Sequence, residues 1–407
     1  MRIAIVSDFF LDYIGGAQTS IQEQRQALED EGHTVFLVSS ARLPRGRRIR
    51  LRERTLEIKP AWVVPGVILP VVGARRALVA YLAEYLARER VDVVHLQTEF
   101  GLAHAMTRAA RTLGIPVVHT VHTFYWQTEG WWQGLIAPLL RLGLENVTET
   151  RFSRLEFTPR ATDNLLRNLT LTMAREADAL VSPSDHQARD LAAAGVTAPI
   201  TVIPNPVARS PRPATLLGEE QLSPPRLLWV ARCEPEKRPL VFVEAALEAR
   251  ERSGGAFEVD FVGDGALLAQ ARRLVHGQPW FRFHGVLDHP AVIDLMDASA
   301  LVVLTSFGFD NQPMTIAEAI SRRRGVLYCD PQLGEGLAHA GHLSATPDAH
   351  GLADAIVELV GDPGALRRLS SGAVDDAATF APRVYVDHIT AAYAAARARL
   401  AEPAPRS

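Results

Sequence analysis

Two cations stand close together after a short apolar run in the second half of the sequence. Arg232 and Lys237 follow the run Arg226 to Ala231 on a segment that contains a proline. A guanidinium offers a planar fork of donors and an ammonium a point charge, so the two together suit a diphosphate. A basic loop facing solvent would look the same. Gly263 follows another apolar run, where a backbone N–H can approach the same anion.

A second group of reactive side chains lies between Ser306 and Ala319. Asp310 precedes a helical pattern and Glu318 lies within it, so both carboxylates can reach one ligand and accept hydrogen bonds from a sugar diol. Alone, Glu318 would be an ordinary residue of an amphipathic face. We expect the helix to begin at Pro313 and to be capped by the two residues before it. Its free N–H groups and dipole would bind an anion through the segment Asn311, Gln312, Pro313, Met314 and Thr315.

The first half carries a glycine pair and a histidine at corresponding places. Gly15 and Gly16 stand between an apolar run and a helical pattern, where a backbone N–H can meet a ligand; a simple tight turn uses the same pair. His122 follows another apolar run, and its imidazole can hydrogen-bond a sugar hydroxyl. His119 lies three residues before it, but no third ligand accompanies them at metal-binding spacing. The sequence therefore predicts neither a metal nor a bound cofactor.

All these residues follow short β-branched runs that alternate with helix-length segments. The runs cover residues 3–6, 35–38, 91–96, 117–121, 179–181, 226–231, 259–262, 281–283, 301–304 and 326–328. Such alternation predicts α/β architecture with parallel sheets, whose ligands bind at the carboxyl ends of the strands. A proline-rich stretch over residues 203–213 divides the series. We therefore expect two doubly wound, Rossmann-like domains.

Composition narrows the class of protein. The chain has 407 residues, of which 47% are hydrophobic, and a formal net charge of −3, so nucleic-acid binding is not expected. Cys233 and Cys329 form no metal-binding or disulfide pattern, which is typical of a reducing cytoplasm. The first apolar run leads directly into Asp8, which favours a strand over a signal peptide. No apolar stretch approaches the roughly 18 to 20 residues that span a bilayer.

In order and spacing, these pieces resemble the family-4 retaining glycosyltransferases of the GT-B fold. The matching pieces are the turn at Gly15 and Gly16, His122, the pair Arg232 and Lys237, and the acidic-x7-Glu motif of Asp310 and Glu318. The resemblance covers nearly the whole chain and implies two Rossmann-like domains facing a central cleft. Residues 1–205 would bind the acceptor, residues 206–383 would bind the nucleotide-sugar donor, and a helix over residues 384–401 would pack back toward the first domain.

The resemblance also implies roles for individual residues. A hexose, mannose or glucose, would pass from GDP or UDP to a hydroxyl with retention of configuration. The residues implied as catalytic are His122, Arg232, Lys237 and Asp310. Those implied to hold the donor are Gly16, Arg232, Lys237, Gly263, Asp310, Asn311, Gln312, Pro313, Met314, Thr315 and Glu318, with the two cations on the diphosphate and Glu318 on the ribose. Those implied to meet the acceptor are Gly15, Thr98, Glu99, His122 and Tyr125.

Some details depart from the family pattern. Asp310 is one methylene shorter than the usual glutamate, and Asn-Gln-Pro-Met follows it in place of Gly-Phe-Pro-Leu, so the donor sugar stays open. The stretches 94–100 and 119–125 resemble the branch that glycosylates diacylglycerol-type lipids. A glycogen-synthase-like polymerase is a rival, but its Lys-x-Gly-Gly signature is absent. A non-catalytic, membrane-associated nucleotide-sugar-binding protein would keep the same residues without turnover. A glycoside hydrolase would need two carboxylates flanking one bond, and the cations beside Asp310 argue against it.

Local charge and aromatic residues suggest docking on an anionic membrane. Seven arginines crowd residues 42–54 beside one acid, Glu53, and residues 61–72 are largely apolar. Trp126, Trp131 and Trp132 precede another apolar stretch, residues 135–140. Arginines favour anionic lipids, and tryptophan suits the bilayer interface. The sequence thus predicts a peripheral protein on the inner face of the membrane; a solvated arginine loop beside an ordinary core is the alternative.

Overall fold

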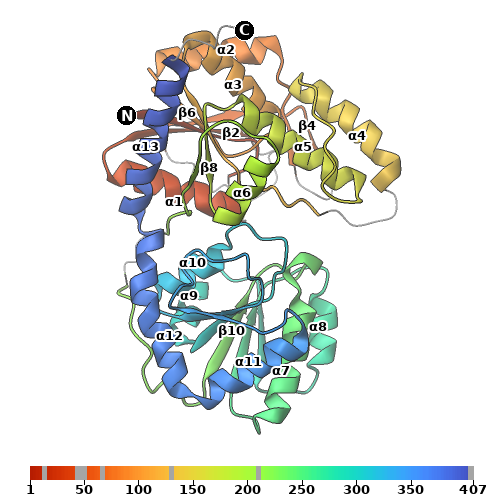
Figure 1. The fold of residues 1–407 in the computed structure, drawn as a ribbon, viewed down its shortest axis with the longest axis vertical. Coiled ribbons are helices and arrows are strands. Elements are labelled where there is room, and N and C mark those ends of the chain that lie inside the picture. Colours follow the sequence, from red (N-terminus) through yellow and green to blue (C-terminus); the bar gives the residue numbers. More distant parts are fainter. Residues whose placement is uncertain (12–15, 42–52, 65–68, 128–132, 208–211, 402–407) are drawn as a thin grey trace. The chain divides into compact units, whose positions relative to one another are not determined.

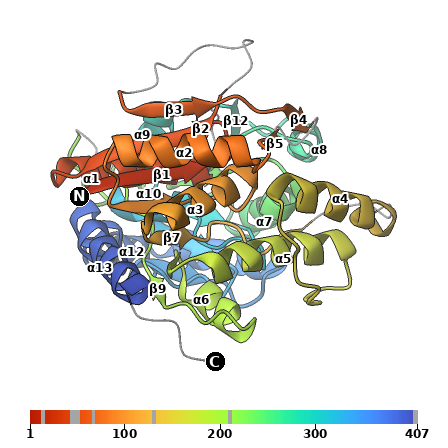
Figure 2. The same ribbon diagram turned by 90° about the horizontal axis from the view of Figure 1, so that it is seen from above.

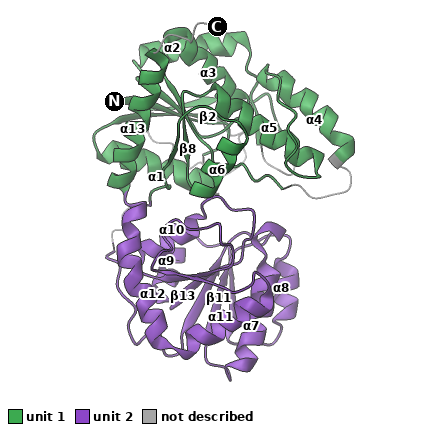
Figure 3. Cartoon of the chain, viewed as in Figure 1, with its two compact units in different colours: residues 1–206, 382–407 green, residues 207–381 purple. Residues whose placement is uncertain are grey.

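The computed structural model describes residues 1–11, 16–41, 53–64, 69–127, 133–207 and 212–401. The chain forms two compact units: unit 1 comprises Met1–Pro206 with Pro382–Ser407, and unit 2 comprises Val207–Ala381 (Figure 3). Unit 1 is therefore built from two separate parts of the chain. The polypeptide crosses between the units twice, after Pro206 and again before Pro382.

Unit 1 is organised around a seven-stranded parallel sheet in the order β3-β2-β1-β6-β7-β8-β9 (Figure 1). The order reverses beside β1, as it does in dinucleotide-binding folds. Its strands are β1 (Arg2–Ser7), β2 (Thr34–Ser40), β3 (Thr55–Ile58), β6 (Val93–Leu96), β7 (Val117–Thr120), β8 (Ala179–Ser182) and β9 (Ile200–Val202). A separate antiparallel hairpin pairs β4 (Trp62–Val64) with β5 (Leu69–Val71).

Helices cover both faces of this sheet, which explains why its strands are apolar throughout. Along β1, Ile3 and Ile5 pack in one core with α1 and α13, whereas Ala4 and Val6 pack in a second core with α2 and α3. The helices are α1 (Gly16–Asp30), α2 (Arg76–Arg88), α3 (Gly101–Leu113), α4 (Gln133–Thr148), α5 (Ala161–Glu176), α6 (Asp185–Ala193) and α13 (Pro382–Ala401). In Figure 2, α4 and α5 lie side by side at the periphery of unit 1.

Unit 2 repeats the plan with a six-stranded parallel sheet in the order β12-β11-β10-β13-β14-β15. Its strands are β10 (Arg226–Val230), β11 (Glu258–Val262), β12 (Phe281–Gly285), β13 (Leu301–Leu304), β14 (Gly325–Tyr328) and β15 (Gly341–Leu343). Its helical segments are η1 (Pro235–Lys237), α7 (Pro239–Arg252), α8 (Leu268–Leu274), α9 (His289–Ala298), α10 (Met314–Ser321), α11 (Ala349–Gly361), α12 (Pro363–Asp376) and η2 (Ala377–Phe380). Leu227 and Trp229 face one core and Leu228 faces the other, so this sheet is also covered on both sides.

Only some of the residues predicted to dock on a membrane lie within the described part of the chain. Of the arginine run, residues 42–52 lie outside the described residues, as do Trp131 and Trp132. Trp126 is partly buried: its indole N–H donates to Thr170 Oγ1 at 3.3 Å and its ring packs edge-on against Phe100. Its place at a bilayer interface stays a prediction.

The two apolar stretches of the membrane-docking prediction, residues 61–72 and 135–140, include exposed side chains. Trp62, in β4, exposes 54% of its surface, and Leu135, Leu139 and Leu142 of α4 face solvent. No described helix combines the length and apolar character required to cross a bilayer.

Candidate functional site

The candidate residues of unit 2 lie where its strand order reverses. β10 and β13 are adjacent, and the loops that follow their carboxyl ends carry Arg232 and Lys237 on one side and Asp310 on the other. Ligands bind at this position in open α/β sheets because the two loops diverge there. The sequence predicted these residues at the ends of separate strands. The strand order explains why the loops that carry them are neighbours.

Lys237 and Asp310 form a salt bridge between Nζ and Oδ1, with side chains only 17% and 9% exposed. The Lys237 carbonyl accepts a hydrogen bond from Thr305 Oγ1 at 2.7 Å, which ties the backbone of η1 to the end of β13. Lys237 Nζ also lies 5.2 Å from the centre of the Phe309 ring. Asp310 Oδ2 is buried and has no hydrogen-bond partner among the described residues. A buried carboxylate oxygen without a partner is costly, so this atom is available to a ligand.

Arg232 does not share this acid. Its side chain is 59% exposed and one guanidinium nitrogen lies 2.7 Å from Glu236 Oε1. In this structure each cation of the predicted pair therefore has its own carboxylate, and they do not converge on one point. The exposed guanidinium can reorient at little cost, because a surface ion pair is worth about 1 kcal/mol or less.

The glycine loop after β11 packs directly against the cation-bearing loop. Gly263 has φ +140°, and a Cβ there would lie 1.9 Å from the Ala231 carbonyl oxygen. Cys233 N donates to the Asp264 carbonyl at 2.9 Å, so the loops are joined through their backbones. Gly263 thus allows the close approach of two loops. A glycine there holds the cationic loop in place whether or not its N–H meets an anion.

The start of α10 differs from the prediction. Pro313 has φ −65° and ψ 120°, which is extended backbone, and the helix begins at Met314. The N-cap residue is Pro313, which makes no side-chain capping hydrogen bond. Thr315 Oγ1 donates to the Val230 carbonyl at 3.3 Å, which fixes the first turn against the end of β10. Asn311 is buried, and Gln312 is partly buried. The helix N-terminus therefore lies beside the end of β10, with Asn311 to Thr315 around it.

Glu318 contacts a residue that the sequence did not suggest. Glu318 is buried, and its Oε1 lies 3.1 Å from Nε2 of His289, the first residue of α9. Asp310 and Glu318 thus pair with different side chains, a lysine and a histidine. His289 stands 29 residues before Glu318, and no local pattern distinguishes it from other surface histidines.

In unit 1, Asp8 and Thr98 occupy the corresponding switch point, after the adjacent strands β1 and β6. Thr98 Oγ1 donates to Asp8 Oδ2 at 2.7 Å and accepts from Asp8 N at 2.8 Å. Asp8 Oδ1 also accepts from Leu102 N at 2.7 Å in the first turn of α3. The Thr98 hydroxyl, predicted to meet the acceptor, is therefore bound to the protein. Asp8 was missed as a site residue, although an acid directly after a buried strand was the signal.

Glu99, next to Thr98, is an unusual carboxyl group. It is 4% exposed and accepts a hydrogen bond from Thr170 Oγ1 at 2.8 Å. Burial, together with nearby Asp8, raises its pKa to about 8. The carboxyl is thus mostly protonated at neutral pH and can donate as well as accept a hydrogen bond.

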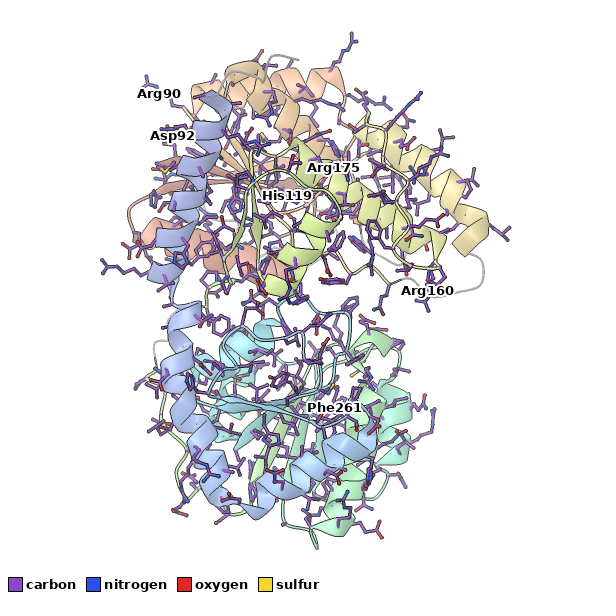
Figure 4. All side chains as sticks on the ribbon, in the orientation of Figure 1. Arg90, Asp92, His119, Arg160, Arg175 and Phe261 are labelled. Atoms are coloured by element: carbon purple, nitrogen blue, oxygen red, sulfur yellow. The ribbon has the colours of Figure 1, made fainter. Side chains whose placement is uncertain are left out.

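His122 is partly buried after β7, and its Nε2 lies 2.5 Å from Gln97 Oε1. Burial lowers its pKa to about 4, so the ring is neutral at pH 7. His119 is fully buried in unit 1 (Figure 4), its pKa is lowered by burial to about 3, and neither ring nitrogen has a partner among the described residues. The part of the chain that is described holds no group of three or more metal-ligating side chains around these histidines or elsewhere.

Tyr125, also predicted to meet the acceptor, is not part of the group formed by Asp8, Thr98 and Glu99. The Tyr125 hydroxyl donates to Asp190 Oδ2 in α6 at 2.7 Å, and its ring stacks on His186 at 5.4 Å. Gly16 is the first residue of α1, with nothing within 4 Å of a Cβ built there, and Gly15 lies outside the described residues. Structure therefore groups Thr98 and Glu99 with Asp8, and links Tyr125 to α6.

Comparisons with known proteins cover both halves of the chain. The family model "Glycosyltransferase Family 4" matches residues 14–210, and the model "Glycosyl transferases group 1" matches residues 224–362. Alpha-monoglucosyldiacylglycerol synthase of Acholeplasma laidlawii is 34% identical over 128 residues, which are 31% of this chain and 30% of that protein. The protein of the same name from Streptococcus pneumoniae is 30% identical over 125 residues, which are 31% of this chain and 27% of that protein. The chain thus matches less than a third of the length of these relatives.

Solved structures resemble the whole chain. HepE of Anabaena, in complex with UDP and glucose, superposes with a TM-score of 0.66 at 17% identity and covers 96% of this chain and 98% of its own. Sucrose-phosphate synthase of Thermosynechococcus elongatus superposes with a TM-score of 0.66 at 18% identity, covering 97% and 98%. At such identities the likeness concerns the fold, and together with the two family models it settles the classification: this chain belongs to the family-4 glycosyltransferases of the GT-B fold.

Proposed function

We propose that this protein is a retaining glycosyltransferase that moves a hexose from a nucleotide-sugar to a hydroxyl acceptor, and that the acceptor is a lipid or glycolipid of the membrane. The observation that carries the proposal is the Lys237–Asp310 pair beside the N-terminus of α10. A cation, a helix N-terminus and a buried carboxylate oxygen without a partner among the described residues are together suited to a ligand that is anionic at one end and rich in hydroxyls at the other.

The charges of this site suit departure of a diphosphate. An ammonium carries three hydrogens, so Lys237 can keep its bond to Asp310 and still donate to a phosphate oxygen. Arg232 is exposed and can turn from Glu236 toward the same anion. Both cations, and the N–H groups at the start of α10, stabilise negative charge as it builds on the leaving group. Asp310 Oδ2 would accept from a hydroxyl of the donor sugar, and Glu318 from the ribose.

No protein nucleophile is required in this mechanism. The acceptor oxygen attacks the anomeric carbon from the side that the diphosphate leaves, the bond to the diphosphate breaks, and a phosphate oxygen takes the acceptor's proton. Retention follows from attack on that face. The protein contributes by orienting the two substrates and stabilising the diphosphate, and the cations stand in for a divalent metal.

The relatives suggest where to look for substrates. HepE was solved with UDP and glucose, and also with UDP-glucose. The Acholeplasma relative is named for forming an alpha-glucoside of diacylglycerol. An alpha-glucoside formed from an alpha-linked nucleotide-sugar corresponds to retention. UDP-glucose with a diacylglycerol acceptor is therefore the first pair to test, ahead of GDP-mannose.

The surface of α4 supports a membrane acceptor. Leu135, Leu139 and Leu142 recur at helical spacing on one face and are 71%, 72% and 67% exposed. The segment that follows α4 exposes Arg151 and Arg154. Leucines that enter the interface, flanked by cations that meet anionic headgroups, are the combination found in peripheral membrane helices. We call Leu135, Leu139 and Leu142 the leucine face of α4.

The direct test is transfer itself. Purified protein is incubated with UDP-glucose or GDP-mannose and vesicles that contain diacylglycerol, and the product's anomeric configuration is read by the proton coupling constant in NMR. An alpha-glycoside is expected. Binding of the nucleotide-sugar without turnover on any acceptor would favour the non-catalytic alternative, a beta-glycoside would contradict retention, and release of free sugar alone would favour a hydrolase.

A further inference from the structure

The neutral ring of His122 is held by a chain of buried amides in unit 1. His122 Nε2 lies 2.5 Å from Gln97 Oε1, and Gln97 Nε2 donates to Gln24 Oε1 at 2.9 Å. Gln97 Nε2 also lies 3.2 Å from His95 Nε2. The Gln97 amide nitrogen therefore faces Gln24 and His95, and the atom that faces His122 is an oxygen, which only accepts. The His122 proton must consequently sit on Nε2.

The orientation of the Gln24 amide sets the direction of the hydrogen bonds between Gln24, Gln97 and His122. Its Oε1 accepts from the Tyr385 hydroxyl at 2.9 Å as well as from Gln97, and its Nε2 donates to Asn205 Oδ1 at 3.0 Å and to Ser20 Oγ at 2.9 Å. Ser20 Oγ itself donates to Asn205 Oδ1 at 2.6 Å. Reversing the Gln24 amide would set its oxygen against the Asn205 oxygen and its nitrogen against the Gln97 nitrogen. Each mismatch would be buried, since Gln24 is 0% and Gln97 1% exposed.

Two hydrogen-bond partners of Gln24 lie beside the two crossings between the units. The first crossing follows Pro206, and Asn205 is the residue before that proline. The second crossing precedes Pro382, and Tyr385 lies in the first turn of α13, which begins there. Within unit 2, Val207 N donates to the Phe380 carbonyl at 3.1 Å, so the two crossing segments are also joined to each other. One amide in α1 thus donates a hydrogen bond to the segment before the first crossing, accepts one from the segment after the second, and is linked through Gln97 to His122.

We propose that Gln97 and Gln24 are positioning residues that hold His122 in its Nε2-protonated form, and that Asn205, just before the first crossing, fixes the orientation of the Gln24 amide. Nδ1 is then the ring atom that accepts a hydrogen bond from a ligand hydroxyl. The inference rests on the proposed function only in assigning that ligand as a sugar. The proton's location is a property of the protein alone.

The test is the tautomer of His122 in the full chain without ligand. Protein labelled with ¹⁵N-histidine is examined by long-range ¹H–¹⁵N correlation at pH 7, and the His122 signals are assigned by their loss in His122→Asn. We expect a protonated Nε2 and a bare Nδ1. In Gln97→Leu the Nδ1-protonated form should appear. Asn205→Leu, which removes the oxygen that accepts from Gln24 Nε2, should shift the population in the same direction, whereas Tyr85→Phe, at a buried tyrosine of α2, should not.

Turnover supplies a second measurement. We expect Asn205→Leu to lower kcat by about two- to tenfold, the effect of one hydrogen bond, with Tyr85→Phe unchanged. If Gln97→Leu does not fold, Gln97→Glu replaces it: the carboxylate still accepts from Nε2 and should raise the pKa of His122 from its value of about 4.

The outcomes separate this inference from the proposed function. A wild-type proton on Nδ1, or His122 signals that are the same in Asn205→Leu and in the Gln97 variant as in wild type, would overturn the positioning roles. The predicted tautomers in a protein that transfers no sugar would contradict the proposed function and leave the positioning roles intact.

Discussion

Lys237 and Asp310 are 73 residues apart in the chain, yet their side chains form a salt bridge in which they are only 17% and 9% exposed. The pair exists because β10 and β13 are neighbours, so the loops after them meet at one edge of the sheet. A partly buried ion pair is weak support for stability, since desolvation offsets much of the attraction. Its position beside the start of α10 is better explained by a ligand that uses both charges.

Removing either cation of the donor site should reduce turnover strongly. We expect Lys237→Ala and Arg232→Ala each to lower kcat by about two orders of magnitude, because each loses a charge-assisted bond that strengthens as the diphosphate leaves. Arg189→Ala is the matched control, an exposed arginine of α6 that also pairs with a nearby acid. Steady-state kinetics measure the effect, and near-normal turnover in both variants would contradict the donor site.

The two carboxylates should affect different parts of the donor. Asp310→Glu restores the usual side-chain length of the family and should change the preference among donor sugars. Glu318→Ala should mainly raise the donor KM, because a ribose contact binds ground state and transition state alike. His289→Ala serves as a control, since it removes the partner of Glu318 and keeps the acid. Unchanged donor kinetics in both acid variants would show that these carboxylates are structural.

Activity should survive chelation. The two cations and the start of α10 provide the positive charge that a divalent ion supplies in other enzymes. We expect transfer rates in EDTA to equal those in untreated protein. Loss of activity that Mg²⁺ or Mn²⁺ restores would refute this, and inductively coupled plasma analysis of the purified protein would then identify any ion it carries.

Glu99 should make the folded state less stable at alkaline pH. Its pKa is raised from 4.5 to about 8 in the folded state, so between those values the native chain binds the extra proton and the free energy of unfolding falls as pH rises. A tenfold difference in proton affinity between the folded and unfolded chain corresponds to about 1.4 kcal/mol. Glu99→Gln should therefore flatten the decline between pH 5 and pH 8, whereas Glu156→Gln, at an exposed position, should not. Urea unfolding at several pH values measures this, and parallel curves for wild type and Glu99→Gln would disprove it.

The leucine face of α4 should bind membranes. Changing Leu135, Leu139 and Leu142 to glutamine should weaken co-sedimentation with vesicles that contain phosphatidylglycerol, because exposed apolar area enters the interface. The matched control changes three exposed apolar residues of unit 2, Leu216, Leu274 and Val286. Equal sedimentation of the two triple variants would argue against this face. Equal activity of wild type on a small soluble acceptor would argue against a lipid substrate.

The strands of both sheets could be predicted because strands covered on both faces are apolar throughout, and such runs are visible in the sequence. The short strands β3, β9 and β15 were not predicted, since Thr55–Ile58, Ile200–Val202 and Gly341–Leu343 are only three or four residues long and lie at sheet edges. In α4, the sequence shows an apolar stretch over residues 135–140. Only the structure separates the exposed Leu135, Leu139 and Leu142 from Leu140 and Leu144, which pack against a core cluster.

Within the site, residue types were predictable and their partners were not. The sequence shows a cation after one strand and an acid after another. That Lys237 pairs with Asp310 can be inferred only when the strand order is known. The partners of His122 and Glu318, which are Gln97 and His289, have no pattern of their own, because a single polar side chain carries no periodicity. Such contacts are specified by tertiary packing.

The return of α13 to unit 1 bears on how the protein is made. Ile389, Ala392 and Tyr393 of that helix fill the core beside Ile21 and Leu28, so this core is incomplete until the final segment has been translated. Unit 2 lies between the two parts in the chain and can finish folding earlier. During synthesis, unit 1 therefore waits with an open apolar face. A nascent chain cut short before Pro382 would be expected to depend on chaperones or to be degraded.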